Sequence, residues 1–141
     1  MGSALVVVGG GPAALSAARA YSAASGSGRV QLFSADLHPP YNRPPMSKGY
    51  LRGESEAEDL PLEHAGFYAE QDIEVFLDRT ATALEPDEAR IILEGGDSVD
   101  FGQCVLATGA VPGTPTGARR GSSGTAVPPL THRRRAAPAD R

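Results

Sequence analysis

The sequence has little of what several classes of protein require. Of its 141 residues, one is a cysteine and none is a tryptophan, and 6% are aromatic. The single cysteine, Cys104, excludes an internal disulfide and suits a reducing compartment. No apolar stretch approaches the ~18 residues that a membrane span requires, and no basic segment of a signal peptide opens the chain. We therefore expect a cytoplasmic protein with no membrane partner.

Basic side chains are scarce in the first part of the chain. Residues 1–112 hold 16 acidic against 7 basic side chains, a net charge of −9, which argues against nucleic acid as a partner because phosphate backbones bind clustered positive charge. Residues 113–141 carry 6 arginines against one acid, and Val127 and Leu130 are their only large aliphatic side chains. This composition predicts one domain over residues 1–112 and a disordered Arg/Pro/Gly-rich tail over residues 113–141.

A βαβ unit is predicted at the start of the chain. Ala4 to Val8 form a short β-branched run that stops at three glycines. Pro12 stands where a first helical residue tolerates proline, and small residues continue the helix to about Ala24. Val30 to Ser34 indicate a second strand. The expected fold class is therefore α/β, with a Rossmann-like βαβ core.

The turn from Gly9 to Ala14 (GGGPAA) fits the pattern G-x-G-x-x-G/A. Gly9 allows the tight turn, Gly11 lets backbone N–H groups approach a pyrophosphate, and Ala14 permits close packing of the helix on the strand. Asp36 follows the second strand about where a carboxylate that accepts a ribose hydroxyl is expected, ~20–25 residues on. We therefore expect a dinucleotide cofactor, NAD or FAD, held by Gly9, Gly11, Pro12, Ala13, Ala14 and Asp36. The competing interpretations are a glycine turn without a ligand and a loop-capping carboxylate.

The rest of the first 112 residues contains short elements. Helices are expected over Met46–Leu51 and Glu63–Gln71, and a strand over Ile73–Leu77. A small antiparallel meander is expected to follow, with the strands Thr80–Leu84, Arg90–Leu93 and Ser98–Phe101 and a turn at Gly95-Gly96-Asp97. A final buried strand is expected over Gln103–Ala107, with Cys104 packing as a small hydrophobe.

Four pieces of the chain occur in an order that resembles a known family: VVVGGGPAALSAA, PPYNRPPMSKGYLRG, the meander and VLATGAVP. Over roughly residues 4–112 they are similar to the FAD-binding part of the pyridine nucleotide-disulfide oxidoreductase superfamily. PYNRPPMSK resembles the signature of its ferredoxin reductase and rubredoxin reductase branch. The resemblance implies FAD as the cofactor, NAD(P)H as the electron donor of the longer family members, and a ferredoxin- or rubredoxin-like electron acceptor as the partner.

The resemblance also implies further site residues. Arg43 and Lys48 lie on a proline-stiffened segment and are expected to reach the pyrophosphate and the flavin end, where positive charge favours the anionic reduced flavin. Ala81 is expected to offer its backbone to the adenine. The turn of Ala107, Thr108 and Gly109 is expected close to the cofactor. The competing interpretations are surface charges for Arg43 and Lys48, and a plain strand-ending turn for residues 107–109.

The chain departs from the family pattern at Gly113. Family members continue into a second, NAD-binding βαβ domain that this sequence does not show, so the fold is expected to be incomplete relative to the family. One hypothesis is that residues 113–141 result from a frameshift or a truncation, which reading the coding DNA in the other two frames would test. The alternative is a natural disordered tail on a minimal flavin-binding protein.

The expected function is the FAD-binding portion of an NAD(P)H-dependent flavoprotein oxidoreductase. The alternatives are a non-catalytic flavin- or dinucleotide-binding module and a nonfunctional fragment. No catalytic residue and no metal ligand stand out in the sequence. His38, His64 and Arg52 are expected to be surface residues.

Overall fold

The computed structural model describes residues 3–24, 28–50 and 52–110. One compact unit is built from residues 3–41 and 61–109, and a second contains residues 42–60. In chain order the elements are β1 (Ser3–Val8), α1 (Pro12–Ala23), β2 (Val30–Phe33), η1 (Pro44–Ser47), η2 (Ala57–Asp59), α2 (Phe67–Glu70), β3 (Ile73–Phe76), β4 (Ala81–Glu85), η3 (Pro86–Glu88), β5 (Arg90–Leu93) and β6 (Ser98–Leu106), where η is a 3-10 helix. None of the helices within the described ranges combines the length and the apolar composition that crossing a bilayer requires. The tail predicted for residues 113–141 lies outside the described residues.

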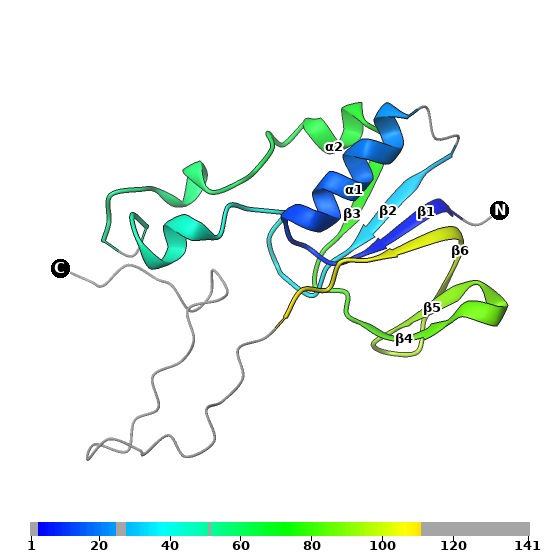
Figure 1. Ribbon diagram of the computed structural model, residues 1–141. Coiled ribbons are helices and arrows are strands. Elements are labelled where there is room, and N and C mark those ends of the chain that lie inside the picture. The colour runs from blue at the N-terminus through cyan, green and yellow to red at the C-terminus, as the bar shows by residue number, and fades with distance from the viewer. Residues whose placement is uncertain (1–2, 25–27, 51, 111–141) are drawn as a thin grey trace, which may run out of the picture. The chain divides into compact units, whose positions relative to one another are not determined.

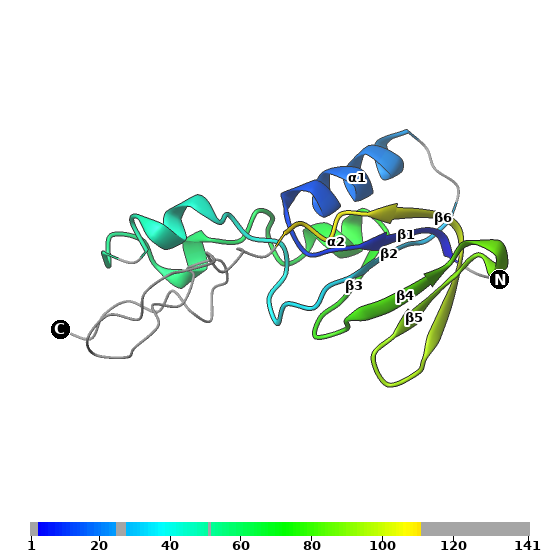
Figure 2. The ribbon, with the colours of Figure 1, turned by 60° about the horizontal axis from the view of Figure 1, so that its bottom comes forward.

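The larger unit is built on a sheet with the strand order β3-β2-β1-β6-β5-β4. β1 pairs in parallel with β2 and β6, and β2 pairs in parallel with β3. β5 pairs antiparallel with both β4 and β6. Figure 1 shows α1 along one face of the parallel strands and the β4–β5 hairpin away from it, and Figure 2 shows the same arrangement after a 60° turn. The expected α/β fold, a parallel βαβ core with an antiparallel meander, is confirmed.

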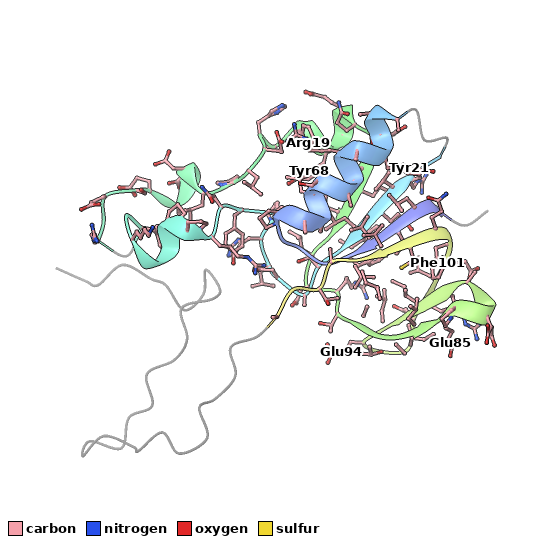
Figure 3. The ribbon with its side chains drawn as sticks, in the orientation of Figure 1. Arg19, Tyr21, Tyr68, Glu85, Glu94 and Phe101 are labelled. Carbon is pink, nitrogen blue, oxygen red and sulfur yellow. The ribbon has the colours of Figure 1, made fainter. Side chains whose placement is uncertain are left out.

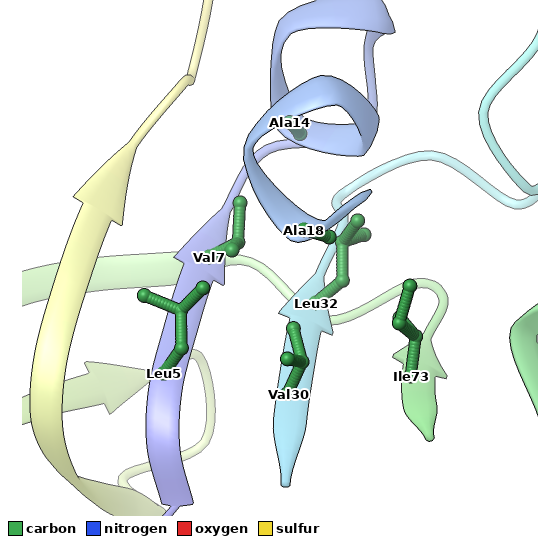
Figure 4. Close-up of a cluster of buried hydrophobic side chains, with 7 residues drawn as sticks. All are labelled: Leu5, Val7, Ala14, Ala18, Val30, Leu32 and Ile73. Atoms are coloured by element: carbon green, nitrogen blue, oxygen red, sulfur yellow. The ribbon is translucent and has the colours of Figure 1, made fainter. Parts of the chain in front are cut away.

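Residues 4–8 of strand β1 are all apolar, and both faces of the strand are covered. Its side chains alternate between two buried clusters, as parallel strands in α/β proteins do. The cluster beneath α1 contains Leu5, Val7, Ala14, Ala18, Val30, Leu32 and Ile73 (Figure 4). The cluster on the meander side contains Val6, Val8, Phe33, Ile91 and Leu93. The alanines of α1 let the helix lie close to the sheet, so the small-residue helix and the β-branched strand form one packing unit.

Strand β6 differs from the prediction of two separate strands. Residues 98–106 form one continuous strand, which pairs antiparallel with β5 over Ser98–Asp100 and in parallel with β1 over Phe101–Leu106. Gly102 lies between the two expected strands, and Gln103 was expected to begin the second of them. Both are exposed, and the strand runs through them because β1 supplies a partner on its other side. The meander and the parallel core therefore share one strand.

The two short helical segments also differ from the prediction. In place of the helix expected over Met46–Leu51, the structure has a 3-10 turn over Pro44–Ser47, where the Lys48 N–H donates to the Pro45 carbonyl. Leu51 lies outside the described residues. Of the helix expected over Glu63–Gln71, only Phe67–Glu70 is α-helical, beginning after Gly66. The meander turn at Gly95-Gly96-Asp97 is as expected, with the Leu93 N–H donating to the Asp97 carbonyl.

Candidate functional site

Three parallel strands of the larger unit end at the same edge of the sheet. Val8, the last residue of β1, pairs with Phe33 at the end of β2 and with Leu106 at the end of β6. The glycine turn, Ser34 and the Ala107-Thr108-Gly109 turn follow these three strand ends directly. In open parallel sheets, ligands bind in the crevice outside the carboxyl ends of the strands. The candidate site is therefore this edge.

The close approach of Gly9 to Ala107 joins two of these segments. Gly9 has φ +140, and a Cβ placed on it would lie 2.1 Å from the Ala107 carbonyl oxygen. The Gly9 N–H donates to the Phe33 carbonyl at 2.8 Å, and the Ala107 N–H donates to the Val8 carbonyl at 2.8 Å. A side chain at position 9 would meet both backbone strain and backbone atoms. Glycine is therefore required at this position by the fold itself.

The N-terminus of α1 carries no compensating negative charge. Gly11 is the N-cap residue, no side chain caps the helix, Pro12 is its first residue, and its first turn has no acidic side chain. Ala13 is exposed, whereas Ala14 is fully buried against β1. The partial positive charge of the helix end is thus available to an anion. This fits the pyrophosphate of a dinucleotide, for which the sequence predicted Gly9, Gly11, Pro12, Ala13 and Ala14.

Asp36 is held in place by its own loop. Its Oδ2 accepts a hydrogen bond from the Tyr41 hydroxyl at 3.0 Å, and its Oδ1 accepts one from the His38 backbone N–H at 3.2 Å. Its backbone N–H donates to Ser34 Oγ at 3.1 Å, and its carbonyl accepts from the Asp78 N–H at 2.9 Å. The carboxylate is half-buried. Asp36 therefore braces the loop, as the competing interpretation expected, and it also lies beside the glycine turn through Ser34.

Three residues of this edge were missed by sequence reasoning: Gly10, Ser34 and Tyr41. A Cβ placed on Gly10 would lie 2.0 Å from Ser34 Oγ, so Gly10 is matched to the buried Ser34 side chain. Gly10 occupies a variable position of the pattern G-x-G-x-x-G/A, so the sequence gave no sign that glycine is needed there. Tyr41 belongs to the PYNRPP stretch. The only sign in the sequence that its side chain would be buried was the position of a tyrosine among prolines.

A shallow groove lies between the meander and the ends of β1 and β6. It has a volume of about 190 Å³ and is lined by Val8, Ala81, Thr82, Ala83, Leu84, Ile91, Leu106 and Thr108. The expected site residues Ala81 and Thr108 are therefore brought to one groove. Leu84 and Leu106 are exposed by 37% and 58%, so part of its wall is apolar surface open to solvent. Gly109 has φ +69 and is exposed.

Arg43 and Lys48 belong to the second unit, where Lys48 is exposed and Arg43 is half-buried. Their expected contact with a cofactor stays a prediction. Arg52 in the same unit lies 4.0 Å from Glu54 and is exposed, as expected.

In the part of the chain that the structure describes, His38, His64 and Cys104 belong to no group that could hold a metal ion. His64 is exposed and lies 3.7 Å from Glu70, whereas His38 is half-buried with its ring edge-on to Tyr41, so His38 is less exposed than expected. Cys104 packs partly against the meander-side cluster, and burial raises the pKa of its thiol. Within the described ranges, no group of three metal-ligating side chains comes together.

Comparison with known proteins gives consistent results. The sequence profile of the pyridine nucleotide-disulphide oxidoreductase family matches residues 3–137. The chain is 37% identical over 106 residues to the 5,5'-dehydrodivanillate O-demethylase ferredoxin reductase subunit of Sphingobium sp. (strain NBRC 103272 / SYK-6), covering 75% of this chain and 26% of that protein. It is 30% identical over 107 residues to a rubredoxin-NAD(+) reductase of Pseudomonas putida, covering 76% of this chain and 28% of that protein. The chain thus spans about a quarter of the length of these relatives.

A solved structure shows the same fold. The crystal structure of the covalent putidaredoxin reductase–putidaredoxin complex superposes with a TM-score of 0.77 at 34% sequence identity. The match covers 86% of this chain and 29% of the matched chain. The similarity therefore extends over most of this chain and over a minor part of the reductase.

Proposed function

The chain belongs to the pyridine nucleotide-disulphide oxidoreductase family, and we propose that it is the FAD-binding portion of an NAD(P)H-dependent reductase that delivers electrons to a ferredoxin- or rubredoxin-like protein. Ferredoxin reductases of this family use FAD and NAD(P)H. The observation that carries the proposal is the contact of the glycine turn with the turn after β6, where Gly9 lies against the Ala107 carbonyl. That contact places an uncapped helix N-terminus at the carboxyl edge of a parallel sheet.

The residues at this edge fit the ADP half of the cofactor. The N-terminus of α1 offers positive potential to the two phosphates, and Asp36 offers an oriented carboxylate to a ribose. Ala81 and Thr108 line the adjacent groove and would contact the adenine side of the ligand. Arg43 and Lys48 are proposed to contact the phosphates and the flavin end, as the resemblance implies. Bound FAD would supply hydride acceptance from NAD(P)H and single-electron delivery; this segment would bind and orient it.

A titration of the purified chain with FAD, followed by quenching of flavin fluorescence, tests the binding step. Riboflavin, which lacks the ADP half of FAD, is the control ligand. FAD is expected to bind and riboflavin to bind far more weakly, because the described site addresses phosphates and a ribose. Equal binding of the two, or binding of neither, would overturn the proposal.

Variants of the second unit test the two basic residues. Arg43→Gln and Lys48→Gln are each expected to weaken FAD binding about 10- to 100-fold if each makes a charged contact with the ligand. Arg52→Gln is the control, because Arg52 is an exposed arginine of the same unit with Glu54 as its neighbour. Loss of affinity in all three variants would indicate a general charge effect and would argue against a specific contact.

A binding module without turnover is the second candidate. Among the described residues there is one strand–glycine turn–helix unit, which accounts for one dinucleotide. NADH added to the FAD-loaded chain distinguishes the two candidates. Bleaching of the flavin band supports a reductase segment, whereas bound flavin that stays oxidised supports a binding module.

A further inference from the structure

The second half of β6 has one edge without a partner strand. From Gly102 to Leu106 the strand pairs with β1 on one side, and no strand of the described residues pairs with it on the other. β5 accompanies β6 only as far as the Phe101 N–H, which donates to the Ala89 carbonyl at 2.8 Å. An unpaired edge presents N–H and C=O groups to which another strand can add. No part of the proposed function uses this edge.

The pairing with β1 determines which backbone groups of β6 face the open edge. From Gln103 onward the register between the two strands is continuous, and the Ala107 N–H donates to the Val8 carbonyl of β1 at 2.8 Å. Successive residues of a strand direct their N–H and C=O groups to opposite edges. Because residue 107 faces β1, residues 103 and 105 also face β1. The backbone groups of Cys104 and Leu106 therefore face the open edge.

This edge is complementary to itself when two copies of the chain run antiparallel with their Cys104 residues opposite each other. The Cys104 N–H and C=O groups of the two copies then face one another and can exchange two hydrogen bonds. In the same register, Leu106 of each copy stands opposite Gly102 of the other copy, as two-fold symmetry requires. Leu106 is 58% exposed, the most exposed large apolar side chain of the described residues, and Gly102 has no side chain to oppose it. Pairing therefore satisfies backbone groups and covers the leucine.

The distribution of charge favours a second copy at this edge. Residues 102–106 (GQCVL) carry no charge, so no like charges meet where the two strands pair. The other edges of the sheet are protected, since β3 carries Glu74 and β4 carries Glu85 and an irregular register. Residues 1–112 as a whole hold 16 acidic against 7 basic side chains, so two copies repel each other at long range. Higher salt screens this repulsion and is expected to strengthen the contact.

We propose that the edge of β6 from Gly102 to Leu106 is an interaction surface for a second copy of this chain, which pairs with it antiparallel across a two-fold axis at Cys104. The sheet of the larger unit then continues from β6 of one copy into β6 of the other. The contact is small, so the dimer is expected to be weak and to depend on concentration. It needs no cofactor, and its failure would leave the proposed function unaffected.

Thiol cross-linking tests the register, because Cys104 is the only cysteine of the chain. In a hydrogen-bonded antiparallel pair the opposite Cα atoms lie about 5.5 Å apart, within the range of about 4.4–6.8 Å that a disulfide spans. Diamide takes up the two thiol hydrogens as the S–S bond forms. It is expected to convert the full chain to a dimer on a denaturing gel without reductant, at a rate that rises with protein concentration and with salt.

The matched control moves the thiol by one residue, in the double variant Cys104→Ala, Gln103→Cys. Gln103 is exposed whereas Cys104 is half-buried, so random collisions would cross-link the control faster. In the proposed register the two residues at position 103 lie diagonally across the axis, about 7–8 Å apart, which is too far for a disulfide. The control is therefore expected to cross-link at least about tenfold more slowly than the wild-type chain. Equal or faster cross-linking at position 103 would overturn the register.

Sedimentation velocity across a concentration series tests the contact itself. Leu106→Gln is expected to weaken the dimer at least about fivefold, because each leucine covers backbone of the other copy. Leu37→Gln is the control, since Leu37 is also exposed, by 40%, but lies in the loop after β2, and it is expected to change the affinity less than about twofold. Circular dichroism shows whether each variant keeps its fold. A wild-type chain that stays monomeric at every concentration, or an equal loss in both variants, would show that no second copy occupies this edge.

Discussion

Gly10 and Ser34 are matched across the candidate site. A Cβ on Gly10 would lie 2.0 Å from Ser34 Oγ and 2.8 Å from Ser34 Cβ, distances that no side-chain contact tolerates. Ser34 is 1% exposed, and its Oγ accepts the Asp36 backbone N–H. Gly10 is not among the glycines with positive φ, so its backbone conformation is accessible to alanine and the conflict is one of space alone.

Gly10→Ala is therefore expected to destabilise the chain by about 1–3 kcal/mol, since the buried serine must move. Ser34→Gly alone should cost about 1 kcal/mol through loss of the hydrogen bond to Asp36. The double variant is expected to be more stable than the sum of the two effects by at least about 1 kcal/mol, because glycine at position 34 makes room for the new methyl group. Urea unfolding of the four chains measures this, and additive effects would show that the two residues are not matched.

Gly9→Ala is expected to destabilise the chain more than Gly10→Ala does. A second substitution that shortens a neighbouring side chain is not expected to restore the stability. The added Cβ meets the Ala107 backbone carbonyl, and φ +140 is unfavourable for alanine. Strain and overlap together are expected to cost more than about 3 kcal/mol. The free energy of unfolding from urea titration is the measurement. A loss below about 1 kcal/mol would contradict the close approach of these two turns.

The side chain of Tyr68 predicts that the free energy of unfolding depends on pH in the alkaline range. Tyr68 packs beside α1 (Figure 3), and burial, with a smaller contribution from the Glu63 carboxylate, raises its pKa above the usual 10.0. The unfolded chain then loses this proton at a lower pH than the folded chain, so the free energy of unfolding falls as the pH rises through 10.0. Between about pH 9 and about pH 11, where tyrosine side chains usually titrate, the free energy of unfolding of Tyr68→Phe is expected to fall less steeply than that of the chain with Tyr68.

The measurement is the urea midpoint as a function of pH for both chains. Both should also carry Cys104→Ala, because burial raises the pKa of the Cys104 thiol and contributes a fall in the same direction. At neutral pH, Tyr68→Phe is expected to be neutral or stabilising by about 1 kcal/mol, because within the described part of the chain the buried hydroxyl has no hydrogen-bond partner. Identical pH profiles would contradict the raised pKa.

The outer edge of β6 predicts self-association at high concentration. β5 pairs with β6 as far as Asp100, and the Phe101 N–H still donates to the Ala89 carbonyl. From Gly102 to Leu106 the edge away from β1 has no partner strand among the described residues. This stretch carries no charge, whereas the β3 edge carries Glu74 and the β4 edge carries an irregular register and Glu85. Charges and irregularities are what protects sheet edges from pairing with other chains.

Gln103→Lys is expected to reduce this association, because Gln103 is exposed and lies in the unpaired stretch. Ala20→Lys is the control, since it adds the same charge on the exposed side of α1. Sedimentation velocity across a concentration series gives the average mass of each chain. A wild-type chain that stays monomeric throughout, or equal association of all three chains, would show that this edge is not the contact.

The parts of the fold that sequence reasoning recovered depend on local signals. The apolar run of β1, the three glycines and the small residues of α1 each determine their own conformation, so the βαβ unit was predictable. The parts that it missed depend on partners far away in the chain. Continuity of β6 through Gly102 comes from pairing with β1, and the requirement for Gly10 comes from Ser34. Asp36 was predicted from its spacing, but the hydrogen bond that it accepts from the Tyr41 hydroxyl could be recognised only in the structure.

The position of β1 in the sheet has a consequence for the order of folding. Ser3 of β1 pairs with Phe101 of β6, so the first of the described strands receives its second neighbour from the last of the described strands. During synthesis, β1 can pack with α1 and pair with β2, and β3 can then pair with β2. The other edge of β1 has no partner until β6 has left the ribosome. Contacts of such long separation slow folding, and an apolar strand with one open edge is exposed to misassociation meanwhile. Refolding is therefore expected to end with the docking of β6 as its slow, concentration-sensitive step.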